Sequence, residues 1–320
     1  MIVLLTGATG FIGRLLAARL AALPTTPAHR LRILTRNLHV PPGILPASAA
    51  IFPWSGAGPV PEAALDGVDS VCHLAGENIG AWPWTAERKR RILDSRVLGT
   101  RALVESLGKL RKPPSVFVAA SALGYYGDAG AALRRETDGP GTGFLAQVVR
   151  AWEAEIFKAD RLGMRTVAIR SGLVLGRAGA LAKMAPVFRL GLGSVLGTGR
   201  QYWSWIHVED TVGIFMHALE QAGLSGAVNG CAPSPTTQGD FSRTLAQAVH
   251  RPLLFKAPGF ALRLALGEMA DTLLQSQNAD AEKILASGYR FRFPALPDAL
   301  ADILAPGQAT GLADGAGGKG

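Results

Sequence analysis

Near its start the chain reads Ile2-Val3-Leu4-Leu5-Thr6-Gly7-Ala8-Thr9-Gly10-Phe11-Ile12-Gly13, a short apolar run followed by three evenly spaced glycines. A helical pattern covers residues 14–23, and a second apolar run, 31–34, begins about 30 residues after the first. A strand, a helix and a strand at this spacing form a βαβ unit, whose two strands lie parallel in one sheet. This stretch therefore predicts a parallel α/β fold.

Further apolar runs, separated by helical patterns, extend this sheet. The runs cover residues 70–74, 115–119 and 166–169, and the helical patterns cover 85–109 and 144–162. Their alternation predicts a doubly wound parallel sheet of the Rossmann type. From about residue 177 the pattern loosens into a glycine-rich stretch. Residues 306–320 are predicted to be a disordered tail, because glycine is frequent there and apolar residues are few.

The three glycines have the spacing of a loop that binds a dinucleotide. Gly7 permits the tight turn after the strand, Gly10 lets the backbone approach a pyrophosphate, and Gly13 lets the helix pack closely on the strand. The pyrophosphate then lies at the N-terminus of the helix, where backbone amides point toward it. Because strand, loop, helix and next strand are all present, we favour dinucleotide binding over an ordinary strand-to-helix turn.

The end of the second apolar run indicates which dinucleotide binds. Enzymes that use NAD usually carry an acidic residue there, which accepts a hydrogen bond from the ribose 2′-hydroxyl. This chain has Thr35-Arg36-Asn37 instead. A hydroxyl and a guanidinium suit a 2′-phosphate, since arginine binds phosphate through two parallel hydrogen bonds. The sequence favours NADP(H), with a solvated arginine at a strand end as the alternative for Arg36.

Composition excludes several classes of protein. Apolar residues make up 48% of the 320 residues, which excludes wholesale disorder. The two cysteines, Cys72 and Cys231, exclude a disulfide scaffold and suit a reducing compartment, so we expect a cytoplasmic protein. We expect no signal peptide, and no apolar run reaches the roughly 18 to 20 residues that span a bilayer. His73 is expected to be structural, and no cluster of metal ligands is visible.

The chain carries a formal net charge of +9, and part of it lies in one predicted helix. Six basic and two acidic residues occur between Ala86 and Arg101. Helical periodicity places Arg96 near the centre of the apolar face, where a charge needs a partner, either a cofactor phosphate or ribose or a buried carboxylate. Without a recognition motif the charge does not indicate nucleic acid. We expect a phosphorylated small molecule as partner, and no nucleic acid or membrane; the oligomeric state is not readable.

Longer strings make a family resemblance specific. The glycine loop resembles that of extended short-chain dehydrogenase/reductases, the superfamily of nucleotide-sugar epimerases. Other strings resemble the atypical "epimerase family" branch, whose members end in a small domain of unknown function. They are His73-Leu74-Ala75-Gly76-Glu77-Asn78-Ile79, Asp94-Ser95-Arg96, Gly124-Tyr125-Tyr126-Gly127-Asp128, Trp152-Glu153, Arg170-Ser171-Gly172-Leu173-Val174-Leu175-Gly176, Phe188-Arg189-Leu190-Gly191-Leu192-Gly193, Ser204-Trp205-Ile206-His207 and Gly288-Tyr289.

The resemblance implies a domain organisation and a set of cofactor contacts. It implies an NADP(H)-binding Rossmann domain over residues 1–232, with a substrate-side insertion at about 177–205, and a smaller C-terminal substrate-side domain over 233–305. For Arg96 it favours the cofactor over a buried carboxylate. The implied cofactor contacts are Gly7, Thr9, Gly10, Phe11, Ile12, Gly13, Thr35, Arg36, Leu74, Ala75, Arg96 and Val174.

The catalytic pair of short-chain dehydrogenases, Tyr-x-x-x-Lys, is missing. In that pair the lysine lowers the pKa of the tyrosine, which passes a proton as hydride moves at the adjacent carbon. The helical segment that should carry the pair has no tyrosine, and no lysine before Lys158. Packing is the alternative for Tyr125, and a surface ion pair for Glu153. The residues predicted to serve catalysis are Tyr125, Ser121 and Glu153, with Gln147 and Arg150 as further substitutes.

Tyr126 and Gln201 are predicted to face the substrate. The two adjacent tyrosines follow the carboxyl end of a strand, where open α/β sheets bind ligands. The segment Trp203–His207 is either a pocket wall or a strand before a helix that Asp210 begins as its N-cap, and its apolar bulk favours the strand. The sequence thus predicts an NADP-dependent oxidoreductase or epimerase for a small polar, sugar-like substrate. The alternative is an NADP-binding regulatory or scaffold protein without hydride transfer.

Overall fold

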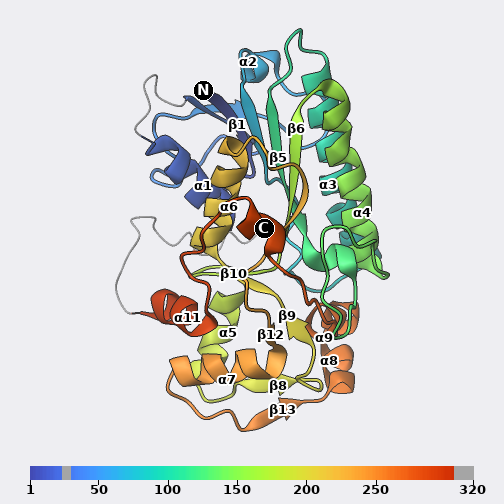
Figure 1. Ribbon diagram of the computed structural model, residues 1–320, viewed down its shortest axis with the longest axis vertical. Helices are drawn as coiled ribbons and strands as arrows, with labels where there is room; N and C mark the ends of the chain where they lie inside the picture. Colours follow the sequence, from blue (N-terminus) through green and yellow to red (C-terminus); the bar gives the residue numbers. More distant parts are fainter. Residues whose placement is uncertain (24–29, 306–320) are drawn as a thin grey trace.

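The computed structural model describes residues 1–23 and 30–305. Its largest element is a seven-stranded sheet in the order β11-β6-β5-β4-β1-β2-β3, in which all neighbouring strands run parallel (Figure 1). The predicted doubly wound sheet is therefore confirmed. The strands are β1 (Ile2–Thr6), β2 (Arg30–Thr35), β3 (Ala50–Pro53), β4 (Ser70–His73), β5 (Val116–Ala122), β6 (Arg165–Ser171) and β11 (Gly226–Gly230).

Helices cover both faces of this sheet (Figure 1). On one face α1 (Phe11–Ala21) and α6 (Val208–Glu220) bury their apolar side chains in a common core with β1. On the other face α2 (Glu62–Leu65), α3 (Ala86–Gly108) and α4 (Phe144–Ile156) form a second core. Successive residues of β1 enter opposite cores, as expected for a strand that is buried on both faces. A 3₁₀ helix, η2 (Phe157–Leu162), continues α4.

A smaller half of the molecule lies beyond the carboxyl ends of the sheet strands (Figure 1). It has its own apolar core, in which Trp205 and Phe241 are almost fully buried. Three short pairs of strands hold it together, β7–β10, β9–β12 and β8–β13. Its elements are β7 (Leu173–Leu175), α5 (Ala180–Arg189), β8 (Ser194–Leu196), β9 (Tyr202–Trp203), β10 (Trp205–His207), β12 (Thr236–Thr237), α7 (Gln238–Ala248), β13 (Phe255–Ala257), α8 (Gly259–Leu266), η3 (Gly267–Ala270), α9 (Asp271–Leu274) and α11 (Leu296–Leu304). The helix α10 (Glu282–Ala286) instead packs on the large sheet, where Ile284 is buried in the core of α1 and α6.

The start of α6 differs from the prediction. His207, not Asp210, is the N-cap, and its ring nitrogen accepts the Glu209 amide at 3.1 Å. Asp210 instead is buried in the first turn, where its carboxylate accepts the amides of Arg292 and Phe293 at 2.7 and 2.9 Å. The expected cap was wrong because a distant segment of the chain supplies better partners for this carboxylate.

The tail over 306–320 lies outside the described residues. Among the helices of residues 1–23 and 30–305, none combines the length and apolar composition needed to cross a membrane.

Candidate cofactor and active site

The loop between β1 and α1 makes contacts that only glycine permits. Gly7 has a φ of +73°, and a Cβ there would lie 2.6 Å from the carbonyl of Leu74, just after β4. A Cβ on Gly13 would lie 2.1 Å from the carbonyl oxygen of Gly7, so α1 meets the turn at very close range. Gly10 is the N-cap of α1 and brings no side chain into the space before the helix. Gly7 thus permits the tight turn after β1, and Gly13 permits the close approach of α1, as the sequence predicted.

The N-terminus of α1 presents unpaired amides. The first backbone bond of the helix runs from the Arg14 amide to the Gly10 carbonyl oxygen, at 3.0 Å. The amides of residues 11–13 have no backbone acceptor within the described chain, and no acidic residue lies in the first turn. Such amides, together with the positive end of the helix dipole, form a site for an anion. The Phe11 ring itself lies against Gly176, whose Cβ would be 2.5 Å from it.

A pocket of about 330 Å³ lies between this helix and the loop after β2. Thr9, Arg14, Asn37 and His39 line it, together with three apolar residues. Arg36 is exposed in the same loop, and neither Arg36 nor Arg14 has a hydrogen bond or ion pair from its side chain to another described residue. Arg14 was not among the residues predicted to contact the cofactor. Its position in the first turn is a signal, because a basic residue there opposes the helix dipole unless an anion binds.

The loop around Thr35 is shaped by the threonine hydroxyl. This oxygen accepts the amide of Asn37 at 3.3 Å. The Asn37 side-chain oxygen in turn accepts the amide of His39 at 2.9 Å. Thr35 thus holds the backbone that presents the pocket residues, and its direct cofactor contact stays a prediction.

The end of β4 adjoins the glycine turn. The Thr6 hydroxyl accepts the amides of Leu74 and Ala75 at 3.2 and 3.1 Å, so both predicted cofactor residues begin their loop beside the turn. The His73 ring is fully buried, with one nitrogen 2.8 Å from the Thr6 hydroxyl and the other 3.0 Å from that of Thr100. Burial lowers the pKa of His73 to about 4. His73 is therefore a neutral residue of the core.

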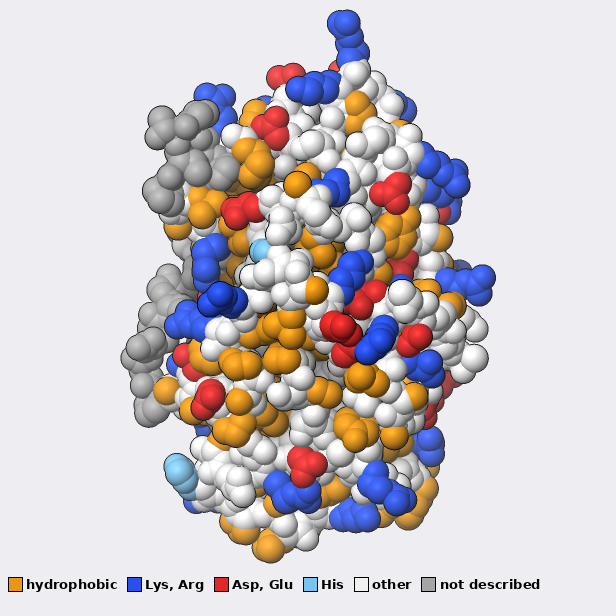
Figure 2. Space-filling view, in the orientation of Figure 1, with side chains coloured by type: hydrophobic (Ala, Val, Ile, Leu, Met, Phe, Trp, Pro, Cys, Tyr) orange, Lys and Arg blue, Asp and Glu red, His pale blue; other side chains and the backbone are white. Residues whose placement is uncertain are grey.

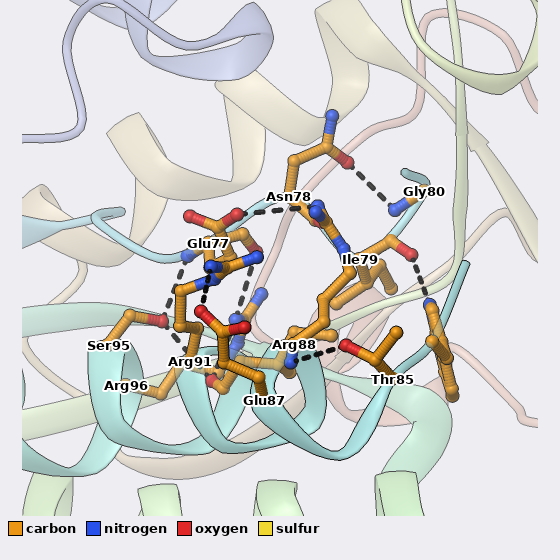
Figure 3. A network of polar contacts seen from close by, with 12 residues as sticks. Glu77, Asn78, Ile79, Gly80, Thr85, Glu87, Arg88, Arg91, Ser95 and Arg96 are labelled. Carbon is orange, nitrogen blue, oxygen red and sulfur yellow. Dashed lines mark hydrogen bonds and ion pairs between the residues drawn. The ribbon is translucent and has the colours of Figure 1, made fainter. Parts of the chain in front are cut away.

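Arg96 points inward from α3, as predicted (Figure 3). One of its terminal nitrogens donates to the carbonyl oxygens of Glu77 and Ile92 at 3.0 and 3.2 Å. Its guanidinium carbon lies 5.2 Å from the ring centre of Trp152. Burial lowers the pKa of Arg96 to about 10, and the charge of Glu77 opposes this. The hydrogen-bond partners of Arg96 are backbone carbonyls rather than a buried carboxylate, and its contact with a cofactor stays a prediction.

The loop that follows β4 is braced from two helices. Arg88, on α3, donates to the Glu77 carboxylate at 3.3 Å and to the Asn78 carbonyl oxygen at 3.0 Å (Figure 3). Lys183, on α5, donates to the Gly80 carbonyl oxygen at 2.9 Å. The smaller half of the molecule is thereby joined to a loop at the carboxyl edge of the large sheet.

The residues predicted to serve catalysis meet in a buried network around Arg170. Glu153, on α4, accepts two hydrogen bonds from Arg170 at 2.8 and 2.7 Å and a third from the Ser121 hydroxyl at 2.6 Å. Glu153 and Arg170 are only 4% and 3% exposed. Burial lowers the pKa of Arg170, but its hydrogen bonds and charge interaction with Glu153 outweigh this and hold the pKa above its usual value. Glu153 therefore forms a buried ion pair rather than a surface one.

Tyr125 and Tyr126, in the 3₁₀ helix η1 (Leu123–Tyr126), contact Arg170 in different ways. The Tyr126 oxygen accepts a hydrogen bond from Arg170 at 2.9 Å and donates toward Asn229 at 2.8 Å. It is 2% exposed, and burial raises its pKa to about 12. Tyr125 is stacked on the guanidinium, whose carbon lies 3.5 Å from the ring centre. Its hydroxyl, unlike that of Tyr126, makes no hydrogen bond to the described residues.

The remaining predicted residues lie around this network. Gln147 and Arg150 are exposed on α4. Val174 lies in β7, half-buried against the core of α1 and α6. Gln201 is 7% exposed, and its amide nitrogen donates to the carbonyl oxygens of Leu196 and Leu273 at 3.0 and 3.2 Å. The cofactor role of Val174 and the substrate roles of Gln201 and Tyr126 stay predictions.

Comparison with known proteins agrees with this architecture. The sequence model of the NAD dependent epimerase/dehydratase family matches residues 3–229. The chain belongs to this family. A second model, of a domain of unknown function named DUF1731, matches residues 257–303. The family resemblance predicted from the sequence is therefore confirmed, including the C-terminal part.

Relatives within the family match over nearly their whole length. "Epimerase family protein YfhF" of Bacillus subtilis is 35% identical over 308 residues, which cover 95% of this chain and 98% of that protein. A chloroplastic homologue of SDR39U1 from Arabidopsis thaliana is 37% identical over 309 residues, 95% of this chain and 87% of that protein. The crystal structure of human epimerase family protein SDR39U1 with NADPH has a TM-score of 0.82 at 34% identity, covering 95% and 99% of the two chains.

Arg170, at the centre of the buried network, was not among the residues predicted for the site. The sequence nevertheless carries a signal for it. A single arginine directly follows the apolar run 166–169 of a central strand, and a charge in that place must find a buried partner. Its partner, Glu153, comes from another element, so only the tertiary structure joins them.

Proposed function

We propose that the chain is an NADP-dependent oxidoreductase or epimerase that acts on a small polar, sugar-like substrate. One observation carries this proposal. At the carboxyl end of β5, where open α/β sheets bind ligands, Tyr125 presents a hydroxyl without a partner among the described residues, and its ring lies 3.5 Å from a buried guanidinium. A tyrosine beside a fixed positive charge is the arrangement that the missing Tyr-x-x-x-Lys pair would have supplied.

The residues at the glycine loop fit NADP(H). The unpaired amides of residues 11–13 would hold the pyrophosphate. Arg14 and Arg36, at the pocket after β2, would bind the 2′-phosphate, and Leu74, Ala75 and Arg96 would line the rest of the cofactor path. Bound there, NADP(H) supplies or accepts the hydride. The NADPH in the human SDR39U1 crystal structure, at 34% identity, supports this choice.

In this proposal Tyr125 exchanges a proton with the substrate oxygen. The guanidinium of Arg170 lies against the ring of Tyr125 and fixes its orientation through a cation–π contact. Ser121 and Glu153 act as positioning residues, since the three hydrogen bonds to Glu153 engage its carboxylate and fix Arg170 under the ring. This role replaces the direct catalytic one first expected of both.

The test first determines whether the purified protein carries bound nucleotide. NADPH oxidation is followed by absorbance with a panel of carbonyl compounds and sugar nucleotides. With an accepted substrate, Tyr125→Phe should lower turnover by about 100-fold or more, the usual contribution of a positioned proton donor. The dissociation constant for NADPH should stay within about twofold. Unchanged turnover in Tyr125→Phe would contradict the assigned proton donor.

A regulatory or scaffold protein that binds NADP without hydride transfer is the second candidate. The observation in its favour is that α4 exposes Gln147 and Arg150 in the region where the Tyr-Lys pair is expected. Tight NADPH binding without oxidation on every compound of the panel favours this function. Substrate-dependent oxidation contradicts it.

The organisation around the site is also part of the proposal. We assign the substrate side to the insertion at 177–205 and to residues 233–305, and the cofactor side to the rest of residues 1–232. A cytoplasmic location stays a prediction.

A further inference from the structure

His39 lines the pocket of about 330 Å³ that lies between the start of α1 and the loop after β2. Asn37 also lines this pocket, whereas Leu38, between the two, is 52% exposed and does not belong to the lining. Alternate residues of this stretch therefore turn toward the pocket. The imidazole of His39 forms part of its wall, on the side opposite α1.

The loop that carries His39 is held in place by its own side chains and by the core. The His39 amide donates to the Asn37 side-chain oxygen at 2.9 Å, and the Asn37 amide donates to the Thr35 hydroxyl at 3.3 Å. Further along the loop, Leu45 packs against the core of α1 and α6. The fold itself therefore presents the imidazole to the pocket, and a ligand does not have to order the loop.

The charged residues of the elements that form this pocket are basic. Arg14 lines the pocket from α1, and Arg36 lies in the loop beside it. No acidic residue occurs in α1 or in residues 36–61. The side chain of His39, like those of Arg14 and Arg36, makes no hydrogen bond or ion pair to another described residue. Three such side chains suit an anion with several oxygens, such as a phosphate.

Histidine differs from the two arginines because its charge depends on pH. An imidazole usually gains or loses its proton between about pH 5 and 8, whereas a guanidinium stays charged. The protonated ring donates two hydrogen bonds and carries a positive charge, and the neutral ring donates one and carries none. A phosphate binds the protonated ring more tightly, so phosphate binding and proton uptake favour each other.

We propose that His39 binds the 2′-phosphate of NADP(H) in its protonated form, so that the preference for NADP(H) over NAD(H) declines as the pH rises through neutrality. This inference rests on the placement of the 2′-phosphate in the proposed function, and not on hydride transfer. At low pH three positive side chains hold the phosphate, and at high pH only two. Arg14 and Arg36 thus supply a selectivity that is independent of pH, and His39 makes it dependent on pH.

A second exposed histidine provides the control. Figure 2 shows Lys and Arg side chains across one face of the molecule and little His. Of the histidines in residues 1–23 and 30–305, only His39 and His250 are exposed. His250 follows α7 in the smaller half, far from α1 (Figure 1). Its replacement removes the same kind of side chain from the surface without touching the pocket.

The experiment uses 2′,5′-ADP and 5′-AMP, which are the adenosine end of the cofactor with and without the 2′-phosphate. Calorimetry compares the wild type, His39→Asn and His250→Asn at about pH 6 and about pH 8.5. We expect His39→Asn to raise the dissociation constant of 2′,5′-ADP at least about fivefold at the lower pH and less than about twofold at the higher, because only the charged hydrogen bond is strong. Proton uptake by the ligand's own phosphate affects all three proteins alike.

His39→Arg separates the charge from the other properties of the side chain. We expect this variant to prefer 2′,5′-ADP over 5′-AMP at both pH values, with no decline at the higher one, because the guanidinium stays protonated. Urea unfolding should give the same midpoint for each variant and the wild type, since His39 and His250 are exposed, and this shows that the variants are folded.

An effect of His39→Asn that is equal at both pH values would overturn the inference. So would an equal effect on 5′-AMP, or an equal effect of His250→Asn. Arg36→Gln tests the placement of the phosphate separately. If Arg36→Gln weakens binding of 2′,5′-ADP and His39→Asn does so at neither pH, the role of His39 alone is refuted. If neither variant weakens it, the phosphate binds elsewhere, and the proposed cofactor contact of Arg36 is refuted as well.

Discussion

Arg14 and Arg36 bring two guanidinium groups to the end of β2, one from α1 and one from the loop after the strand. Arg14 lines the pocket, whereas Arg36 lies beside it on the surface. Neither has an acidic partner among the described residues, so in the proposed function both are free to bind a phosphate on the adenosine ribose. We therefore expect that the side chains of Arg14 and Arg36 decide whether this site prefers NADPH or NADH.

We expect Arg36→Glu to weaken NADPH binding much more than NADH binding. Loss of a charged hydrogen bond to the 2′-phosphate costs about 1.5–3 kcal/mol, which corresponds to about 10- to 100-fold in the dissociation constant, and the new carboxylate repels the phosphate further. Fluorescence titration with both nucleotides measures this, with Arg14→Gln for comparison. An equal loss for NADPH and NADH would rule out contact of Arg36 with the 2′-phosphate.

The ion pair of Glu153 and Arg170 gives a second prediction for single residues. Glu153→Gln should lower the free energy of unfolding by about 3 kcal/mol, because it leaves the charge of Arg170 buried without a counter-charge. Glu87→Gln is the control, since its ion pair with Arg91 is exposed and should change stability by less than about 1 kcal/mol. Urea unfolding compares them. Similar values for the two variants would show that the buried pair has no structural role.

Among the elements, α1 depends most on its glycines. The helix begins at Phe11, earlier than the pattern predicted, because Gly10 caps it and Gly13 lets it touch the turn. The strand β3 was not predicted at all. It has only four residues, includes Pro53 and pairs with one neighbour, so neither its length nor its pattern distinguishes it from a loop.

Gly13→Ala should disturb both stability and cofactor binding. Its Cβ would lie 2.1 Å from the carbonyl oxygen of Gly7, so α1 must move away from the turn. We expect a loss of about 1–3 kcal/mol in the free energy of unfolding and NADPH binding too weak to titrate. Gly223→Ala is the matched control, because a Cβ there meets nothing within 4 Å. NADPH affinity equal in the two variants would refute the close contact.

At the scale of the whole molecule, buried polar groups join parts that are distant in sequence. His73 links β1 to α3 through two threonine hydroxyls. Asp210, in α6, binds the amides of Arg292 and Phe293 and so fastens the C-terminal segment to the Rossmann half. These buried hydrogen bonds fix the positions of β1, α3, α6 and the C-terminal segment relative to one another.

His73 makes the stability of the molecule dependent on pH. Its pKa is lowered from 6.5 to about 4 in the folded state, so the unfolded chain binds the proton more readily between these values. The free energy of unfolding should therefore fall as the pH decreases from about 6.5 to about 4, by about 3 kcal/mol from this group. Urea unfolding of wild type and His73→Asn measures the difference, in which contributions from carboxylates cancel. Parallel pH curves for the two proteins would contradict this.

The sequence by itself determined the Rossmann sheet, the glycine turn and the family, because strand periodicity and glycine sterics are local properties of neighbouring residues. It also indicated that Arg96 points inward, since helical periodicity alone decides that direction. Only the tertiary structure decided that Glu153 is held by Arg170, that Asp210 binds a distant segment, and that Arg14 faces the pocket after β2. Each of these depends on contacts between residues that are far apart in the chain, and no local pattern encodes which partner a buried charge will meet.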